Sequence, residues 1–184
     1  MPHADGSSSG NVESATDRRD RFLKATQNHA EFRRKLAELG LTTSSDEILE
    51  YARHVGECWF GLATEHLQDA KDAAQRGMSR SVYSRSYYAV YNASKAVRYL
   101  AQGWVSLKTE DHQKAVDLPG DFPDVDNWSI AVRELYEHRL RADYDNWATT
   151  AGKNTLKPDD CIARAETFVV EAARYLNRKY GTKL

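Results

Sequence analysis

Apolar side chains recur at three- and four-residue steps through most of this chain, the spacing that places them on one face of an α-helix. A glycine or a proline follows the end of most of these periodic stretches, where helices commonly stop. No stretch alternates apolar and polar residues as a half-buried strand would. The pattern predicts helices over about residues 17–39, 45–77, 80–102, 109–118, 126–140 and 158–180.

These helices favour an all-α, up-and-down helical bundle of about five to six helices, because short connections make sequence neighbours pack antiparallel. Residues 1–16 are rich in Gly, Ser and Asn, lack apolar anchors and are expected to form a disordered tail. Residues 17–44 are then an N-terminal helical extension, and residues 45–184 are the bundle. Between the last two helices, a loop is expected from Asp143 to Lys157.

Composition excludes an indiscriminate polyanion binder, because 26 Lys and Arg nearly balance 27 Asp and Glu. Any site for a polyanion must therefore be local. The N-terminus lacks the apolar core of a signal peptide, and no run approaches the roughly 20 apolar residues of a membrane helix. We expect a cytoplasmic protein without a membrane segment. Cys58 and Cys161 lie in apolar helical patterns and are expected to be reduced core thiols.

The common signatures of metal and phosphate sites do not occur in this sequence. It contains no Gly-rich phosphate loop, nucleophile elbow, His-Glu-x-x-His or Cys-x-x-Cys, so we expect neither a metal nor a cofactor. The six histidines are scattered along the chain, and only the fold could bring any of them together.

Two segments carry more chemistry than a plain bundle requires. In the segment 85–92, aromatics surround an arginine, and helical spacing lines up polar residues on one side: Ser81, Arg85, Tyr88, Asn92 and Lys95. The segment 139–147 crowds two arginines, two aspartates and two aromatics around a helix end. Arginine presents a donor fork to phosphate, and an aromatic ring can stack on an unpaired base. The sequence predicts a ligand groove formed by Arg85, Tyr88, Asn92, Arg139, Asp143 and Tyr144.

An internal role for these arginines is the alternative. Arg85 on one helix could meet Asp143 at the end of another as a brace, with the tyrosines serving only as core. We expect Arg85 to be such a brace, since it lies in mid-helix among tyrosines, and Arg139 to serve a ligand.

At these segments the sequence resembles the small stand-alone members of the HEPN family. Residues 85–92 resemble the family's Arg-x-Tyr-Tyr-Ala-x-Phe-His-Ala signature, and residues 139–145 resemble its second signature, Arg-x-x-Ala-Asp-Tyr. Between them, residues 109–116 are similar to a short Thr-His-x-x-Val segment, and the last helix is similar to the family's closing helix. The resemblance extends from about Glu47 to Tyr180.

The resemblance implies a helical bundle that is usually a dimer and that in many members cuts RNA without a metal ion. Other members bind nucleotides or act as partners of a nucleotidyltransferase, and members recur in toxin–antitoxin pairs and in defence against phage. Catalytic members carry an Arg followed, after four to six residues, by a His. The pair polarises the scissile phosphate and helps the 2′-hydroxyl to attack it.

This chain departs from that pattern, because no His follows Arg139 at the expected place. A literal match occurs earlier in the same helix, where Arg133 precedes His138 by the required spacing, and this pair is a candidate catalytic pair. His112 is a further candidate acid or base if its short helix folds over the groove.

Three interpretations of function remain. The first is a HEPN-type RNA-binding protein or metal-independent ribonuclease in a toxin–antitoxin or antiviral defence setting. The second is a non-catalytic HEPN protein that binds a nucleotide or a protein partner, such as an operon-encoded nucleotidyltransferase. The third is a plain helical adaptor. The arginine and tyrosine stripe favours an RNA-directed role, and the four tryptophans favour a homodimer that covers them.

Overall fold

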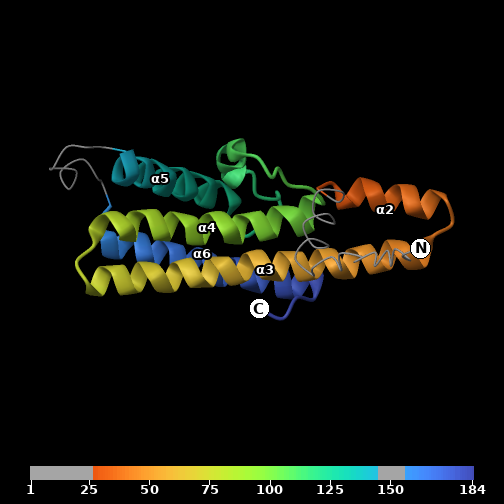
Figure 1. The fold of residues 1–184 in the computed structure, drawn as a ribbon, viewed down its shortest axis with the longest axis horizontal. Coiled ribbons are helices and arrows are strands. Elements are labelled where there is room, and N and C mark those ends of the chain that lie inside the picture. The colour runs from red at the N-terminus through yellow and green to blue at the C-terminus, as the bar shows by residue number, and fades with distance from the viewer. Residues whose placement is uncertain (1–26, 145–155) are drawn as a thin grey trace, which may run out of the picture.

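The structure is a computed structural model that describes residues 27–144 and 156–184. The described residues form five α-helices and one 3₁₀-helix: α2 (His29–Glu38), α3 (Thr42–Gln75), α4 (Ser79–Gln102), η1 (Thr109–Val116), α5 (Val125–Tyr144) and α6 (Pro158–Tyr180). An isolated bridge between Asn28 and Trp104 is their one element of β-type pairing. Figure 1 shows an elongated helical bundle, which confirms the predicted all-α fold.

Helix α4 is the centre of the bundle, with α3, α5 and α6 packed around it (Figure 1). Its sequence helps to explain this position, because small and β-branched residues such as Ala89, Ala93 and Val97 lie along one face of α4 and let a neighbouring helix approach closely. From Asn92 to Leu100 every residue of α4 is buried, including polar ones. A one-sided apolar stripe, which the sequence indicates, therefore underestimates how much of α4 lies inside the protein.

The N-terminal extension is attached at the C-terminal end of α4. Helix α2 packs on the first turns of α3, and this helical pair projects beyond the bundle in Figure 1. His29 Nε2 lies 2.9 Å from the carbonyl oxygen of Tyr99. Gly103 has φ +76, and a Cβ there would lie 2.2 Å from Ala30 Cβ, so only glycine permits this approach.

The sequence misplaces the apolar face of this first helix. Of the residues in α2 only His29 is buried, whereas Leu39, the last apolar residue of the helix predicted over residues 17–39, is 75% exposed. The reason is that α2 lies against α3 beyond the end of α4, and no third helix of the described residues covers its other side. The predicted start at residue 17 and the predicted tail at residues 1–16 lie outside the described residues.

The remaining helix boundaries agree with the sequence pattern to within a few residues, with one consequence for the site. The expected loop does not begin at Asp143, because α5 continues to Tyr144. A salt bridge between residues one helical turn apart supports this last turn, with Arg139 Nε 2.7 Å from Asp143 Oδ2. Among the described residues, no helix has the length and apolar character needed to span a membrane.

Candidate functional site

The polar residues singled out in the sequence gather along the line where α4 meets α5, and η1 closes one end of this line. We call it the seam and define it by Arg85, Tyr88, His112, Tyr136 and Arg139. Two pockets lie along it, a polar one beside Arg85 and a more apolar one beside His112. The residues come from three segments that are distant in sequence, and each segment is held in place differently.

The segment η1 is fixed to α4 by a buried carboxylate. The side chain of Asp111 is 0% exposed and accepts hydrogen bonds from Arg98 Nη1 and Nη2, each at 3.0 Å. The Tyr91 hydroxyl donates to Asp111 Oδ2 at 2.9 Å, and Lys95 Nζ lies 3.4 Å from the same oxygen. Burial favours the neutral acid, but the hydrogen bonds and charge of Arg98 outweigh it and keep the pKa of Asp111 below its ordinary value.

This anchor carries His112, the next residue, into the seam. Its ring stacks on that of Tyr91 with centroids 4.3 Å apart and faces Tyr136 at 6.3 Å. His112 Nδ1 lies 2.9 Å from the hydroxyl of Tyr87. Burial, followed by the positive charge of Arg139, lowers the pKa of His112, so its imidazole is neutral near pH 7. The short helix does fold over the seam, as the candidate role of His112 requires.

Arg139 contacts two aromatic rings, one hydroxyl and one carboxylate. Its guanidinium carbon is 5.4 Å from the Tyr88 ring centroid and 5.3 Å from that of Tyr144. Nη2 donates to the Tyr88 hydroxyl at 2.9 Å. Nε is 2.7 Å from Asp143 Oδ2, but its N–H does not point at that oxygen, so this contact is ionic. In the described part of the chain Nη1 also makes no hydrogen bond, and, unlike Nε, it is not among the buried atoms without a partner, so it is available to a ligand.

Arg85 contacts α3 and has no ion pair with Asp143 among the described residues. Its Nη1 lies 3.1 Å from His66 Nδ1 and 3.7 Å from Asp69 Oδ2. The Arg85 side chain is 45% exposed, compared with 12% for Arg139. The sequence predicts the more internal role for Arg85, and the exposures show the opposite order. The reason is that Arg85 lines the open polar pocket beside Asp143, where water reaches the guanidinium.

The polar pocket brings three of the predicted groove residues close together. It has a volume of about 360 Å³ and is lined by Arg80, Ser81, Ser84, Arg85, Tyr88 and Asp143. Asn92 is only 8% exposed, and its side chain donates to the carbonyl oxygen of Tyr88 at 2.9 Å, within its own helix. Asn92 thus lines neither pocket described here, because α4 is buried all round from this residue to Leu100.

The candidate pair Arg133 and His138 is not brought together. Residues five apart on a helix point about 140° from each other, and here Arg133 is exposed whereas His138 is 1% exposed. The His138 ring stacks on Tyr83 at 5.6 Å, and its Nε2 lies 3.9 Å from Glu134 Oε1. Arg133 instead lines the second pocket of the seam, together with His112.

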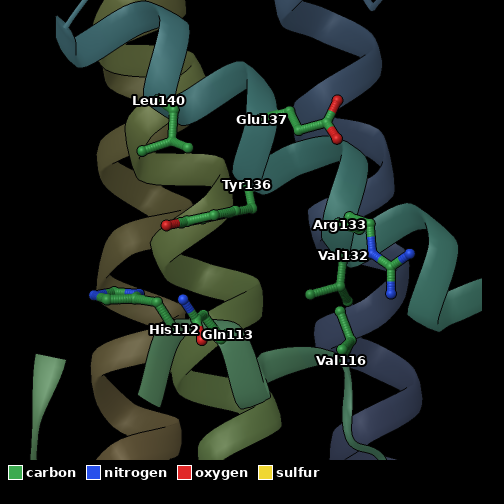
Figure 2. Close-up of a pocket in the computed structure, with 8 residues that line it drawn as sticks. All are labelled: His112, Gln113, Val116, Val132, Arg133, Tyr136, Glu137 and Leu140. Atoms are coloured by element: carbon green, nitrogen blue, oxygen red, sulfur yellow. The ribbon is translucent and has the colours of Figure 1, made fainter. Parts of the chain in front are cut away.

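This second pocket lies between η1 and α5 and has a volume of about 300 Å³ (Figure 2). Its α5 wall consists of residues at helical steps, of which only Arg133 is a site residue predicted from the sequence: Val132, Arg133, Tyr136, Glu137 and Leu140. The four-residue spacing of Arg133 and Glu137 predicts that they share one side of a helix. The opposite wall, formed by η1, could not be predicted, because it depends on where Asp111 attaches to α4.

Comparison with known protein families places the chain. Residues 57–176 match the HEPN domain, which is more than half of the 184-residue chain, and the chain therefore belongs to the HEPN family. A search of curated proteins and a search of solved structures gave no match. All five residues of the seam lie inside the matched region, whereas α2 and the first turns of α3 precede it. The described residues contain no group of three His, Cys, Asp or Glu side chains arranged to hold a metal ion.

Proposed function

We propose that this HEPN protein acts on RNA, holding a single-stranded segment along the seam and cleaving it without a metal ion. The observation that carries the proposal is the state of His112. Its half-buried imidazole is hydrogen-bonded through Nδ1 to Tyr87, and burial together with the nearby charge of Arg139 lowers its pKa, which favours the neutral form. A neutral imidazole fixed through one nitrogen and available through the other is the arrangement that general-base catalysis requires.

The chemistry assigned to these residues is transesterification within the RNA backbone. With the proton of His112 on Nδ1, the Tyr87 oxygen accepts that N–H, and the Nε2 lone pair is available to the seam. Nε2 removes the proton of a ribose 2′-hydroxyl, whose oxygen bonds to the adjacent phosphorus while the bond to the 5′-oxygen breaks. The 5′-oxygen takes a proton from water. Arg139 Nη1 stabilises the negative charge that develops on the phosphoryl oxygens.

The rest of the seam supports binding of a single strand. Tyr88, Tyr136 and the exposed ring of Tyr144 offer faces for unpaired bases, and Arg85 lines the polar pocket one turn of α4 away from Tyr88. Because the net charge is only −1, attraction of RNA depends on this local group of arginines. Binding should therefore weaken steeply with added salt.

The proposal is tested by incubating the purified chain with single-stranded RNA in the presence of EDTA. His112→Gln should lower the cleavage rate by at least about a hundredfold, the usual contribution of a general base, while binding changes little. The control is His54→Gln, at an exposed position on α3. Tyr87→Phe removes the acceptor for Nδ1 and should lower the rate by less, with an altered pH profile.

Unchanged cleavage by His112→Gln would contradict the proposed mechanism. If His138→Ala then abolished cleavage, the reaction would belong to Arg133 and His138, and the helix would have to rearrange to expose that imidazole. Loss of cleavage in His112→Gln with equal loss in His54→Gln would indicate a folding defect, which circular dichroism of both variants distinguishes.

A non-catalytic HEPN protein that binds a nucleotide or a protein partner is the second candidate. It is favoured by the contacts of Arg139, because two of its three guanidinium nitrogens already contact Tyr88 and Asp143 and only one remains for a reacting phosphate. RNA or nucleotide binding that requires Arg139, without cleavage of any RNA, would support it. A homodimer, an operon-encoded partner and a toxin–antitoxin or defence setting remain proposals that follow from the family, and a cytoplasmic location remains a proposal from the sequence. Trp104, 38% exposed, is available for such an interface, whereas Trp59 packs edge-on against Tyr99.

A further inference from the structure

We infer that the pocket between η1 and α5 receives a guanine base, so that the protein prefers RNA with a guanosine next to the phosphate bound at His112. This inference rests on the proposed function and specifies its substrate. The pocket is the one drawn in Figure 2, and none of its α5 residues takes part in the chemistry proposed above.

The shape of the pocket suits a flat, partly apolar ligand. Val116 from η1 and Val132 and Leu140 from α5 supply aliphatic surface, and Tyr136 supplies an aromatic face. Its volume of about 300 Å³ is at the small end of ligand sites, which fits one base better than a whole dinucleotide. Single-stranded RNA is commonly read in this way, by stacking an unpaired base and bonding its edges.

The polar groups at the rim select among the bases. Arg133 and Glu137 stand one turn apart and project to the same side of α5 in Figure 2. No salt bridge joins them, and in the described part of the chain Arg133 has no acidic partner, although both side chains are exposed. Glu137 Oε2 lies 3.6 Å from Arg141 Nη2, a loose contact that leaves the carboxylate free to accept further hydrogen bonds.

Guanine is the base whose edges match this pair. Its N7 and O6 accept a two-point hydrogen bond from an arginine, and its N1–H and N2–H donors can be received by a carboxylate. Adenine places an acceptor, N1, where Glu137 needs a donor, and cytosine does the same with N3. Uracil offers a single N3–H donor and has no N7 for Arg133. A mismatched base would leave Glu137 or Arg133 without a partner as it is desolvated, which is the source of discrimination.

The pocket is continuous with the rest of the seam. His112 lines it, and the same ring is the proposed base for RNA cleavage. Tyr136 faces both the pocket and the His112 ring, with centroids 6.3 Å apart. A guanine stacked at Tyr136 therefore has its own ribose and phosphate beside His112.

Binding of short, uridine-rich, single-stranded oligonucleotides by fluorescence anisotropy tests the inference. The central nucleotide is guanosine, inosine, 7-deazaguanosine or adenosine, and 2′-O-methyl riboses block cleavage. Replacing guanosine by adenosine should weaken binding about tenfold, as expected for loss of a two-point contact. Inosine lacks the N2 amino group, and its effect should be about threefold, as expected for one hydrogen bond.

Variants assign each edge of the base to one side chain. Glu137→Gln should abolish the difference between guanosine and inosine, and Arg133→Gln should abolish the difference between guanosine and 7-deazaguanosine. Matched controls are Glu47→Gln and Arg178→Gln, at exposed positions outside the seam, which should bind like the unmodified protein.

The outcomes separate the inference from the function on which it rests. RNA binding with equal affinity for guanosine and adenosine would overturn the guanine pocket and leave the RNA-directed function standing. A guanosine preference that survives in both pocket variants would also overturn it, because the preference would then arise elsewhere. Failure to bind any of the oligonucleotides would overturn the proposed function and the inference together.

Discussion

Two arginine–aspartate pairs of this protein have the same chemistry and opposite surroundings. Arg98 and Asp111 join two segments of the chain, are 2% and 0% exposed, and meet through two hydrogen bonds of 3.0 Å. Arg139 and Asp143 lie on one helix, are 12% and 27% exposed, and meet through a single ionic contact of 2.7 Å. The first pair holds η1 on α4, and the second borders the seam.

The comparison shows that exposure and the number of contacts decide what such a pair can do. All the acceptor capacity of Asp111 is directed to Arg98, Tyr91 and Lys95, so the pair has nothing left for a ligand. Arg139 retains a free nitrogen and a partner that water can reach. The first pair is therefore expected to contribute to stability, and the second mainly to binding.

Asp111→Ala should have the largest effect on stability. It leaves Arg98 and Lys95 as buried cations without their carboxylate, and removal of one member of a buried ion pair costs about 3–5 kcal/mol. The free energy of unfolding from urea titration, followed by circular dichroism, measures the loss. Asp111→Asn keeps one oxygen acceptor and should lose less. A loss under about 1 kcal/mol for the alanine variant would show that η1 is not anchored by this residue.

Arg139→Ala should cost only about 1 kcal/mol of stability, because the stranded Asp143 can be solvated. Binding of RNA should weaken about tenfold, since one charge-assisted contact to phosphate is lost. Urea titration and fluorescence anisotropy on the same preparation separate the two effects. If stability fell by as much as in Asp111→Ala while RNA binding per folded molecule stayed unchanged, Arg139 would be a brace and not a ligand group.

As the pH falls, the stabilising contribution of the histidines should be lost before that of Asp111. Burial lowers the pKa values of His29, His66 and His112, so the unfolded chain binds their protons more readily than the folded one. Their stabilising contribution is complete above the ordinary histidine pKa of about 6.5 and is lost as the pH falls through the lowered values. Asp111, with its own pKa lowered below the ordinary carboxylate value, loses its contribution only in stronger acid.

Thermal unfolding between pH 7.5 and pH 4.5 measures the contribution of the histidines. The loss of stability over this range should be smaller than the loss caused by Arg139→Ala. In His112→Gln the decline below about pH 6.5 should become shallower. A melting temperature independent of pH over this range would contradict the depressed pKa values.

Arg85→Ala should have the smallest effect on stability, below about 0.5 kcal/mol, because an exposed ion pair contributes little. The half-exposed contacts of Arg85 with His66 and Asp69 are of this kind. Urea titration alongside Arg139→Ala ranks the two arginines directly. A larger loss of stability for Arg85→Ala than for Arg139→Ala would contradict the order of the exposures and support the internal role that the sequence predicts for Arg85.

Contacts within one helix could be predicted from the sequence, and contacts between helices could not. The i, i+4 spacing of Arg139 and Asp143 is visible in the chain, as are the glycines and Pro158 at helix ends. The alignment of α3 against α4 is not, and this alignment gives Arg85 the partners His66 and Asp69. The position of His112 depends on Asp111, which binds Arg98. The apolar pattern alone does not show which face of α4 carries Arg98.

The connection between α3 and α4 has a consequence for the order in which the protein folds. These two helices are joined by a turn at Gly77, so they can pair by closing a very short loop, whereas the seam needs η1 and α5 to return onto α4. Contacts of low sequence separation cost the least loop-closure entropy and tend to form first. We therefore expect the α3–α4 hairpin to belong to the folding nucleus and the seam to form late. Changes in seam residues should then mainly accelerate unfolding and leave the folding rate almost unchanged.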